Sequence, residues 1–146
     1  MEEQKNETAN TSSTNQVAPK ATGVGGIFFF SEDPKKTNEW YSSNLGLEAN
    51  AYGVSFESRN INRPEEINTL QWCLFKKGSE HFAPSKKEFM INYTVQNIEG
   101  LVEKLKKNGV TIVDDIASYD YGKFVHIMDP EGNKIELWEP IDNGGK

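Results

Sequence analysis

Cysteine is nearly absent from this chain of 146 residues, in which Cys73 stands alone. A lone thiol excludes a disulfide within the chain, and a chain without disulfides fits a reducing compartment. Long apolar runs are also lacking: the longest, 27–30, is far too short to span a bilayer, and no segment has the pattern of a secretory signal. We therefore expect a cytoplasmic protein that does not enter a membrane.

Positive charge is scarce as well. The chain has 16 Lys and Arg residues against 22 Asp and Glu residues, for a formal net charge of -6. Non-specific binding of nucleic acid requires a basic surface, and the sequence contains no basic block with interleaved aromatic residues. Nucleic acid is therefore not an expected partner.

Residues 1–22 are mainly Glu, Gln, Asn, Thr, Ser and Lys, with few apolar side chains. Such a segment buries too little apolar surface to offset the entropy lost on ordering, so we predict a disordered leader. The remaining residues, 23–146, have the length and composition of one globular domain.

The first half of this domain predicts a helix between short strands. Asp33 can accept hydrogen bonds from free backbone N–H groups, Pro34 suits the first helical position, and Gly46 favours a stop. Branched and aromatic residues predict the strands around this helix, at 27–30, 51–57 and 69–75.

The second half repeats this plan. Asn97 is a helix N-cap, and Gly109 follows an apolar stripe with helical spacing. The predicted strands are 89–95, 110–113, 124–128 and 135–138. A shift of about 64 residues superposes Asp33 on Asn97, which indicates an internal duplication. We predict module 1 at about 23–80 and module 2 at about 88–140, both sharing one core.

A dense cluster of turn residues, Asp-Pro-Glu-Gly-Asn at 129–133, separates two predicted strands. If this hairpin closes symmetrically, His126 lies directly across from Glu136 on one face. A carboxylate beside an imidazole raises the imidazole pKa and orients the ring, and acid–base catalysis requires both. His126 and Glu136 are therefore the candidate catalytic residues; the alternative is that His126 only fills space in a strand.

Further residues are candidates for contact with a ligand. Strand alternation places Phe124 on the face of His126 and Trp138 on the face of Glu136. Asn92 lies in an otherwise apolar strand and must find a hydrogen bond from a ligand or from a neighbouring main chain. The aromatic residues can equally belong to the core. The candidate ligand-binding residues are Trp72, Asn92, Tyr121, Phe124 and Trp138.

These features resemble the vicinal oxygen chelate superfamily, which contains glyoxalases, bleomycin-resistance proteins and extradiol dioxygenases. The resemblance covers roughly residues 24–140. The motifs that carry it are Asp33-Pro34, Trp40-Tyr41, Leu45-Gly46-Leu47, the helix unit from Val95 to Gly109, and Asp129-Pro130-Glu131-Gly132-Asn133-Lys134-Ile135-Glu136-Leu137. It implies an α+β fold in which two βαβββ modules form an open half-barrel cleft, a small-molecule ligand in that cleft, and a homodimer.

The resemblance also implies four metal-ligand positions, on the first and last strands of each module. The matching residues are Gly26, Met90, approximately Trp72, and Glu136. Of these, only Glu136 can ligate a hard or borderline cation. We therefore expect a degenerate metal site and no cofactor; the alternative is a divalent metal with His126 as a second ligand.

Three hypotheses for the function follow from the resemblance. The leading one is a protein that binds a small organic ligand and catalyses proton transfer next to a carbonyl group, as an isomerase, epimerase or lyase. His126 is then the base or acid, and Glu136 orients it. The second is a non-catalytic or drug-sequestering protein in which Trp72 and Trp138 stack on a planar ligand. The third is a metal-dependent lyase or dioxygenase.

Overall fold

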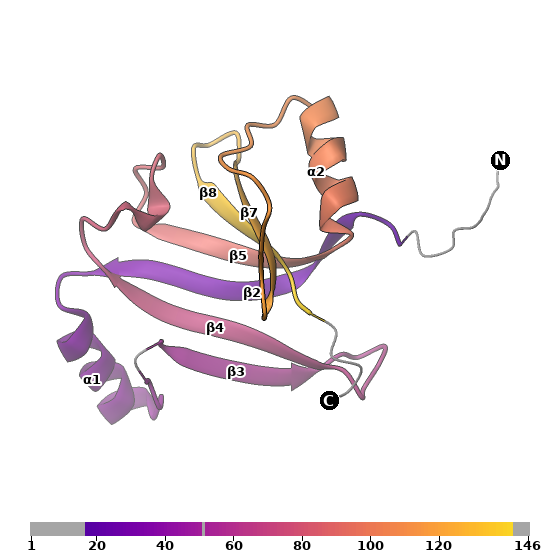
Figure 1. Ribbon diagram of the computed structural model, residues 1–146. Helices are drawn as coiled ribbons and strands as arrows, with labels where there is room; N and C mark the ends of the chain where they lie inside the picture. The colour runs from indigo at the N-terminus through magenta and orange to yellow at the C-terminus, as the bar shows by residue number, and fades with distance from the viewer. Residues whose placement is uncertain (1–16, 51, 142–146) are drawn as a thin grey trace.

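The computed structural model describes residues 17–50 and 52–141, which form one seven-stranded sheet, two α-helices and a short 3-10 helix (Figure 1). In chain order the elements are β2 (Lys20–Ser31), α1 (Pro34–Leu45), β3 (Val54–Arg59), β4 (Ile67–Lys76), η2 (Glu80–Phe82), β5 (Phe89–Gln96), α2 (Ile98–Lys107), β6 (Ala117–Tyr119), β7 (Gly122–Met128) and β8 (Lys134–Glu139). This is the α+β class that the sequence predicts.

The sheet contains two similar strand groups; the second has the four strands of a βαβββ module, and the first has only three, β2, β3 and β4. Its strand order is β3-β4-β2-β5-β8-β7-β6. β2 pairs in parallel with β4, β5 pairs in parallel with β8, and the antiparallel pair of β2 and β5 joins the two groups at the centre. In Figure 1, β3, β4, β2 and β5 lie across the molecule, and the β7–β8 hairpin stands steeply against them. The sheet is therefore strongly twisted.

The start of the folded chain differs from the prediction. Because β2 begins at Lys20, residues 20–22 belong to a central strand and not to a disordered leader. Pairing with β5 orders this polar stretch, since Lys20 of β2 pairs with Gln96 of β5. The Gln96 side chain also donates to the carbonyl oxygen of Ala18 at 2.7 Å. The rest of the predicted leader, 1–16, lies outside the described residues.

Both helices begin at the predicted capping residues, and α1 also ends at its predicted cap, whereas the C-cap of α2 is Asn108 and not Gly109. Asp33 accepts the backbone N–H of Lys36 at 3.2 Å, and α1 ends at Gly46, whose φ of 73° is left-handed. Asn97 accepts the backbone N–H of Gly100 at 3.1 Å and starts α2. Local capping chemistry was therefore sufficient to position both helices.

Apolar side chains form two clusters on the helix side of the sheet, one beside each helix. The cluster at α1 has buried Val54, Trp72 and Leu74. The cluster at α2 has buried Val95, Ile98, Leu101, Val102, Val125, Ile127 and Leu137. The expected single core is therefore divided in two. Figure 1 shows the reason: α1 and α2 lie at opposite ends of the twisted sheet, so each covers its own strands.

The segment before β7 also departs from the prediction. Residues 110–113 do not form a strand and make only an isolated bridge between Ile112 and Ile127. The short strand β6, which the sequence did not predict, pairs with β7 at the sheet edge.

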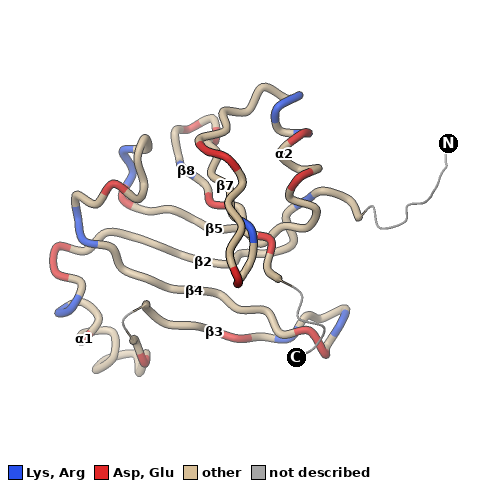
Figure 2. Tube along the Cα trace, in the orientation of Figure 1, with Lys and Arg blue, Asp and Glu red and all other residues tan. Residues whose placement is uncertain are grey.

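Within the described residues, no helix is both long and apolar enough to cross a membrane. Figure 2 shows Lys and Arg distributed over several elements among Asp and Glu rather than gathered on one.

Candidate functional site

The two faces of the sheet differ in character. Ile135 and Leu137 pack in the α2 cluster, so strand alternation turns Glu136 and Trp138 of β8 to the opposite side. We call the side opposite the helices the open face.

One polar row crosses the open face, because paired residues in neighbouring strands share a face. The row runs through His126, Glu136, Asn92, Gly26, Gln71 and Ser55. The predicted register of the β7–β8 hairpin, with His126 across from Glu136, is confirmed.

The His126 ring lies between two carboxylates. Its Nδ1 is 2.7 Å from Asp114 Oδ2, and its Nε2 is 2.8 Å from Glu136 Oε2. The other Asp114 oxygen accepts the backbone N–H of His126 at 2.8 Å, which fixes this carboxylate beside the ring. An ionised carboxylate only accepts hydrogen bonds, so both ring nitrogens must donate. The geometry therefore favours the imidazolium form.

The pKa of His126 is raised above its ordinary value of 6.5. Burial of the ring opposes the charged form, but the hydrogen bonds and negative charges of Glu136 and Asp114 together outweigh that effect. The side chains of His126 and Glu136 are 19% and 17% exposed, so water screens their interaction only in part. The cationic form of His126 is thus favoured next to Glu136.

Neighbouring donors orient both oxygens of Glu136. Oε2 meets the His126 ring, and Oε1 accepts a hydrogen bond from Asn92 Nδ2 at 2.7 Å. A carboxylate offers about four acceptor positions, so each oxygen keeps capacity for one more hydrogen. Glu136 is therefore an oriented group that can still take a proton from a ligand on the open face.

Asn92 reaches Glu136 only because Gly25 has no side chain. Asn92 is 2% exposed, and its Oδ1 has no hydrogen-bond partner among the described residues. A Cβ atom on Gly25 would lie 2.5 Å from that oxygen, so the Asn92 amide occupies the space that a side chain would need. The Asn92 amide thus donates to Glu136 through Nδ2, while its buried oxygen Oδ1 accepts no hydrogen bond among the described residues.

Aromatic side chains continue the open face beside this row. Phe124 and Trp138 stack with their ring centroids 5.8 Å apart, and Tyr121 meets Phe124 edge-on at 5.6 Å. The Trp138 indole N–H donates to the carbonyl oxygen of Tyr121 at 2.9 Å. We call Tyr121, Phe124 and Trp138 the aromatic wall. It brings three of the predicted ligand-binding residues next to the two catalytic candidates.

Trp72, in contrast, lies on the helix side of the sheet. It is 9% exposed and packs edge-on against Tyr41 at 4.8 Å and Phe29 at 5.5 Å. Alternation along β4 gives the open face to Gln71 instead. The structure therefore does not bring Trp72 to the side of the sheet on which Glu136 lies.

The connection between the two strand groups covers one end of the open face. Phe82 of η2 is 1% exposed and stacks on Phe30 with 4.5 Å between centroids. Lys134, two residues before Glu136 on β8, donates from Nζ to the carbonyl oxygen of His81 in η2 at 2.8 Å. η2 therefore lies on one side of the row, toward the start of β8, and the aromatic wall lies on the other side, toward the end of β8.

A sequence model of the Glyoxalase/Bleomycin resistance protein/Dioxygenase superfamily matches residues 23–137. The chain belongs to this superfamily. The match confirms the resemblance that the motifs carry. No curated protein is similar enough in sequence to match the chain.

Solved structures with the superfamily fold resemble the chain at low identity. Methylmalonyl-CoA epimerase from Mycobacterium tuberculosis is 19% identical, with a TM-score of 0.55 over 88% of this chain and 95% of that chain. The Streptomyces coelicolor methylmalonyl-CoA epimerase in complex with 2-nitronate-propionyl-CoA is 14% identical, with a TM-score of 0.60 over 84% of this chain and 100% of that chain. A superfamily member from Vibrio splendidus 12B01 is 14% identical, with a TM-score of 0.53 over 84% and 99%. These likenesses show the fold.

The strand register corrects two of the metal-ligand positions that the superfamily resemblance implied. The parallel pairs place Gln71 and Asn92 in the polar row, at the positions assigned from the sequence to Trp72 and Met90. The Met90 assignment failed because Asn92 lies five positions before its helix N-cap Asn97, whereas Gly26 lies seven before Asp33, so the offset of about 64 does not hold in these strands.

The residues present do not fit a divalent metal. Gly26 has no ligating side chain, and the side-chain oxygen of Gln71 already accepts the hydroxyl of Ser55. Within residues 17–50 and 52–141, no group of three or more His, Cys, Asp or Glu side chains is arranged to hold a metal ion.

Sequence reasoning missed Asp114, Gly25 and Lys134. Asp114 reaches His126 because the preceding residue is hydrogen-bonded to β7, with the Val113 N–H donating to the His126 carbonyl oxygen at 2.8 Å. The only signal in the sequence was that Asp114 follows a predicted strand. Gly25 lies at an irregularity in the pairing of β2 with β5, and no local pattern announces such an irregularity.

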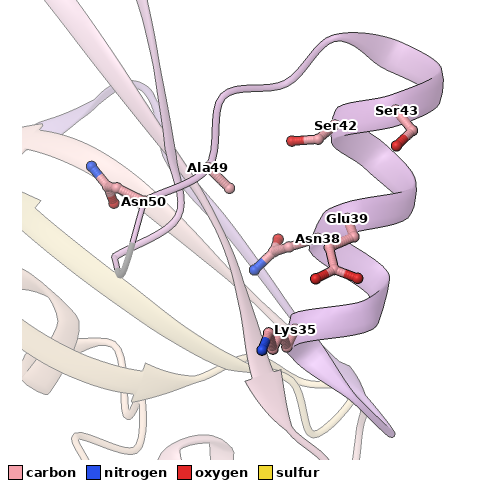
Figure 3. Close-up of a pocket in the computed structure, with 7 residues that line it drawn as sticks. All are labelled: Lys35, Asn38, Glu39, Ser42, Ser43, Ala49 and Asn50. Atoms are coloured by element: carbon pink, nitrogen blue, oxygen red, sulfur yellow. The ribbon is translucent and has the colours of Figure 1, made fainter.

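Two surface cavities lie away from the polar row. Figure 3 shows the first, about 280 Å³ in volume, between α1 and the segment that follows it; its lining residues are Lys35, Asn38, Glu39, Ser42, Ser43, Ala49 and Asn50. The second, of about 240 Å³, is apolar and lies between α2 and the sheet; its lining residues are Ala21, Tyr93, Leu101, Leu105, Ile127, Ile135 and Leu137. Neither cavity includes a residue of the row.

Proposed function

We propose that this superfamily member catalyses proton transfer at a carbon atom next to a carbonyl group of a small organic molecule. The reaction class is isomerisation, epimerisation or a lyase reaction that begins with the same step. The observation that carries the proposal is the arrangement of Glu136, whose carboxylate is oriented by His126 on one side and Asn92 on the other. An oriented carboxylate on a partly shielded face is suited to general base catalysis.

The contacts favour Glu136 as the base and His126 as the group that positions it. Both ring nitrogens of His126 meet carboxylates, so a cationic ring has no lone pair with which to take a proton. The sequence suggested the reverse assignment, in which His126 is the base or acid. Asp114, which the sequence did not point to, accounts for the change because it occupies the second ring nitrogen.

The reaction transfers a proton between a carbon atom of the ligand and a carboxylate oxygen of Glu136. The ligand C–H donates its proton to Glu136, and the protonated carboxyl group returns a proton to the same or to another position. The His126 ring holds the Glu136 carboxylate in place through Nε2. The known superfamily fold adds support by analogy, since two of the similar structures are epimerases.

The test is deuterium exchange followed by proton NMR. The full-length protein is incubated in D2O with methylmalonyl-CoA, 2-oxo acids and 3-oxo acids, and the signal of the hydrogen next to the carbonyl group is followed. We expect its loss with at least one compound. Glu136→Gln should slow this exchange by about 100-fold or more, as expected when a general base is removed.

Glu103→Gln is the matched control, because Glu103 is an exposed residue of α2 on the helix side. It removes the same charge and should leave exchange unchanged. Wild-type exchange at the rate of the protein-free solution with every compound, or equal exchange in Glu136→Gln, would overturn the proposal.

A second candidate function is binding without turnover, and the aromatic wall favours it. Phe124 and Trp138 present stacked rings beside the polar row, and flat aromatic faces bind planar ligands. Trp72, which lies on the helix side of the sheet, takes no part in this candidate binding function. The discriminating result is a compound that quenches the fluorescence of Trp138 and shows no exchange. Homodimerisation and a cytoplasmic location stay predictions.

A further inference from the structure

Lys134 is a buried cation without a counter-ion. It is 9% exposed, and strand alternation places it on the open face with Glu136. No ion pair within the described residues includes it. Its one hydrogen bond within the described residues goes to the carbonyl oxygen of His81. Lysine side chains are almost never buried without a charge partner.

A structural role alone does not account for this lysine. An ammonium group has three N–H donors, and only one of them has a partner among the described residues. A neutral donor such as glutamine can hold a carbonyl oxygen without the penalty of burying a charge. The unpaired charge and the unused donors therefore indicate that an anionic oxygen completes the site.

We propose that Lys134 binds the oxygen that becomes negative when Glu136 removes the proton from a carbonyl compound. The inference rests on the proposed function and adds a substrate-binding residue to it. Lys134 and Glu136 project from the same face of β8, with their Cα atoms about 7 Å apart along an extended strand. A molecule with its acidic carbon at Glu136 can thus direct its carbonyl oxygen toward Lys134.

The step balances without any further reactant. The C–H bond breaks, the proton goes to Glu136, and the electron pair of that bond forms a C=C double bond. The π electrons of the carbonyl group move to its oxygen, which becomes an enolate oxygen. The Lys134 ammonium donates a hydrogen bond to that oxygen and remains protonated. Such a donor stabilises the charge that develops during the reaction.

The probe for this site is oxalate, a planar anion of the shape of an enolate, with oxamide as its neutral counterpart. Thermal unfolding of the full-length protein is measured with increasing amounts of each. We expect oxalate to raise the Tm of the wild type and oxamide to have no effect, because only the anion pairs with the ammonium group. Lys134→Met should lose the response and be at least as stable as the wild type without oxalate.

Two variants make the result specific. Lys76→Met removes an equal charge from an exposed position at the end of β4 and should keep the full oxalate response. Lys134→Gln can still donate to the His81 carbonyl oxygen but carries no charge, and it should also lose the oxalate response. This variant therefore tests the inference even if Lys134→Met does not fold. An absent oxalate response in the wild type, or an equal response in Lys134→Gln, overturns the inference.

Failure of this inference is distinguishable from failure of the proposed function. Lys134→Gln should slow deuterium exchange by about 100-fold, as does removal of other donors to a developing negative charge. Unchanged exchange in this variant overturns the role of Lys134 and leaves Glu136 as the base. Oxalate binding that depends on Lys134, in a protein with no exchange activity, supports the anion site and overturns the proton-transfer function.

Discussion

Asp114, His126, Glu136 and Asn92 form a continuous series of hydrogen bonds, so charge and orientation are set together at this site. A histidine with a single carboxylate neighbour can keep one nitrogen free to accept a proton. With a carboxylate at each nitrogen, both ring nitrogens are engaged and the cationic form of the ring is favoured. The part of the site that faces a ligand is then the carboxylate of Glu136.

Replacing Asp114 by Asn should lower the pKa of His126 toward its ordinary value, since one of the charges that raise it is removed. In the wild type, the raised pKa adds stability that is complete below the unfolded value of about 6.5 and is lost as the pH rises through the folded-state value. Urea unfolding between about pH 5.5 and about pH 8.5 should therefore show a larger loss of stability in the wild type than in Asp114→Asn.

Asp115→Asn is the control for that experiment, because Asp115 is the exposed neighbour of Asp114. It should follow the wild type across the pH range. An identical pH dependence in Asp114→Asn and in the wild type would show that Asp114 does not hold the His126 charge.

Gly25→Ala should destabilise the protein by about 1–3 kcal/mol, as overpacking in a tight site does. The added Cβ would lie 2.5 Å from Asn92 Oδ1 and 2.8 Å from Thr94 Cγ2, so the Asn92 amide must move away from Glu136. Gly23→Ala is the matched control, since its nearest contact is Thr94 Oγ1 at 3.3 Å. Equal unfolding free energies for the two variants, measured in urea, would contradict this explanation.

At the scale of elements, the sequence correctly predicted the features that depend only on residues close together in the chain. The Asp33 and Asn97 caps and the 129–133 turn each depend on a few neighbouring residues, and they gave the helix starts and the register of His126 with Glu136. The errors came from relations between distant segments. The pairing of β4 with β2 puts Gln71, not Trp72, in the polar row, and hydrogen bonding of the segment before β6 to β7 brings Asp114 to the site.

The short element η2 is expected to be a stabilising part of the open face. Phe82→Ala should cost about 3–5 kcal/mol in unfolding free energy, because it empties a fully enclosed position between Phe30 and Phe75. Phe56→Ala is the control, since Phe56 is 44% exposed on β3 and should lose much less. Similar losses for both variants in urea unfolding would mean that η2 does not pack as described.

At the scale of the whole molecule, two apolar clusters are joined by one continuous sheet. The antiparallel pair of β2 and β5 lies at its centre and connects the strands beside α1 to those beside α2. The site is built almost wholly from the second group, with Gly25 and η2 contributed from outside it. Loss of either cluster should therefore affect the site.

This continuity predicts a single unfolding transition. Leu74→Ala in the α1 cluster and Leu101→Ala in the α2 cluster should each destabilise the protein by about 2–5 kcal/mol. In both variants, tryptophan fluorescence and far-UV circular dichroism should shift together, as a two-state transition requires. Two separate transitions, or a shift in only one signal, would show that the two clusters unfold independently.

The protonation of His126 tests the central claim most directly, because the assignment of Glu136 as the base depends on a cationic ring. The measurement is the 15N chemical shift of both ring nitrogens in histidine-labelled protein at pH 6.5, the ordinary pKa of the side chain, with His81→Gln used for assignment. We predict that well over half of the His126 rings carry a proton on both nitrogens. A ring that is half neutral or more at this pH would contradict the account and return the role of base to His126.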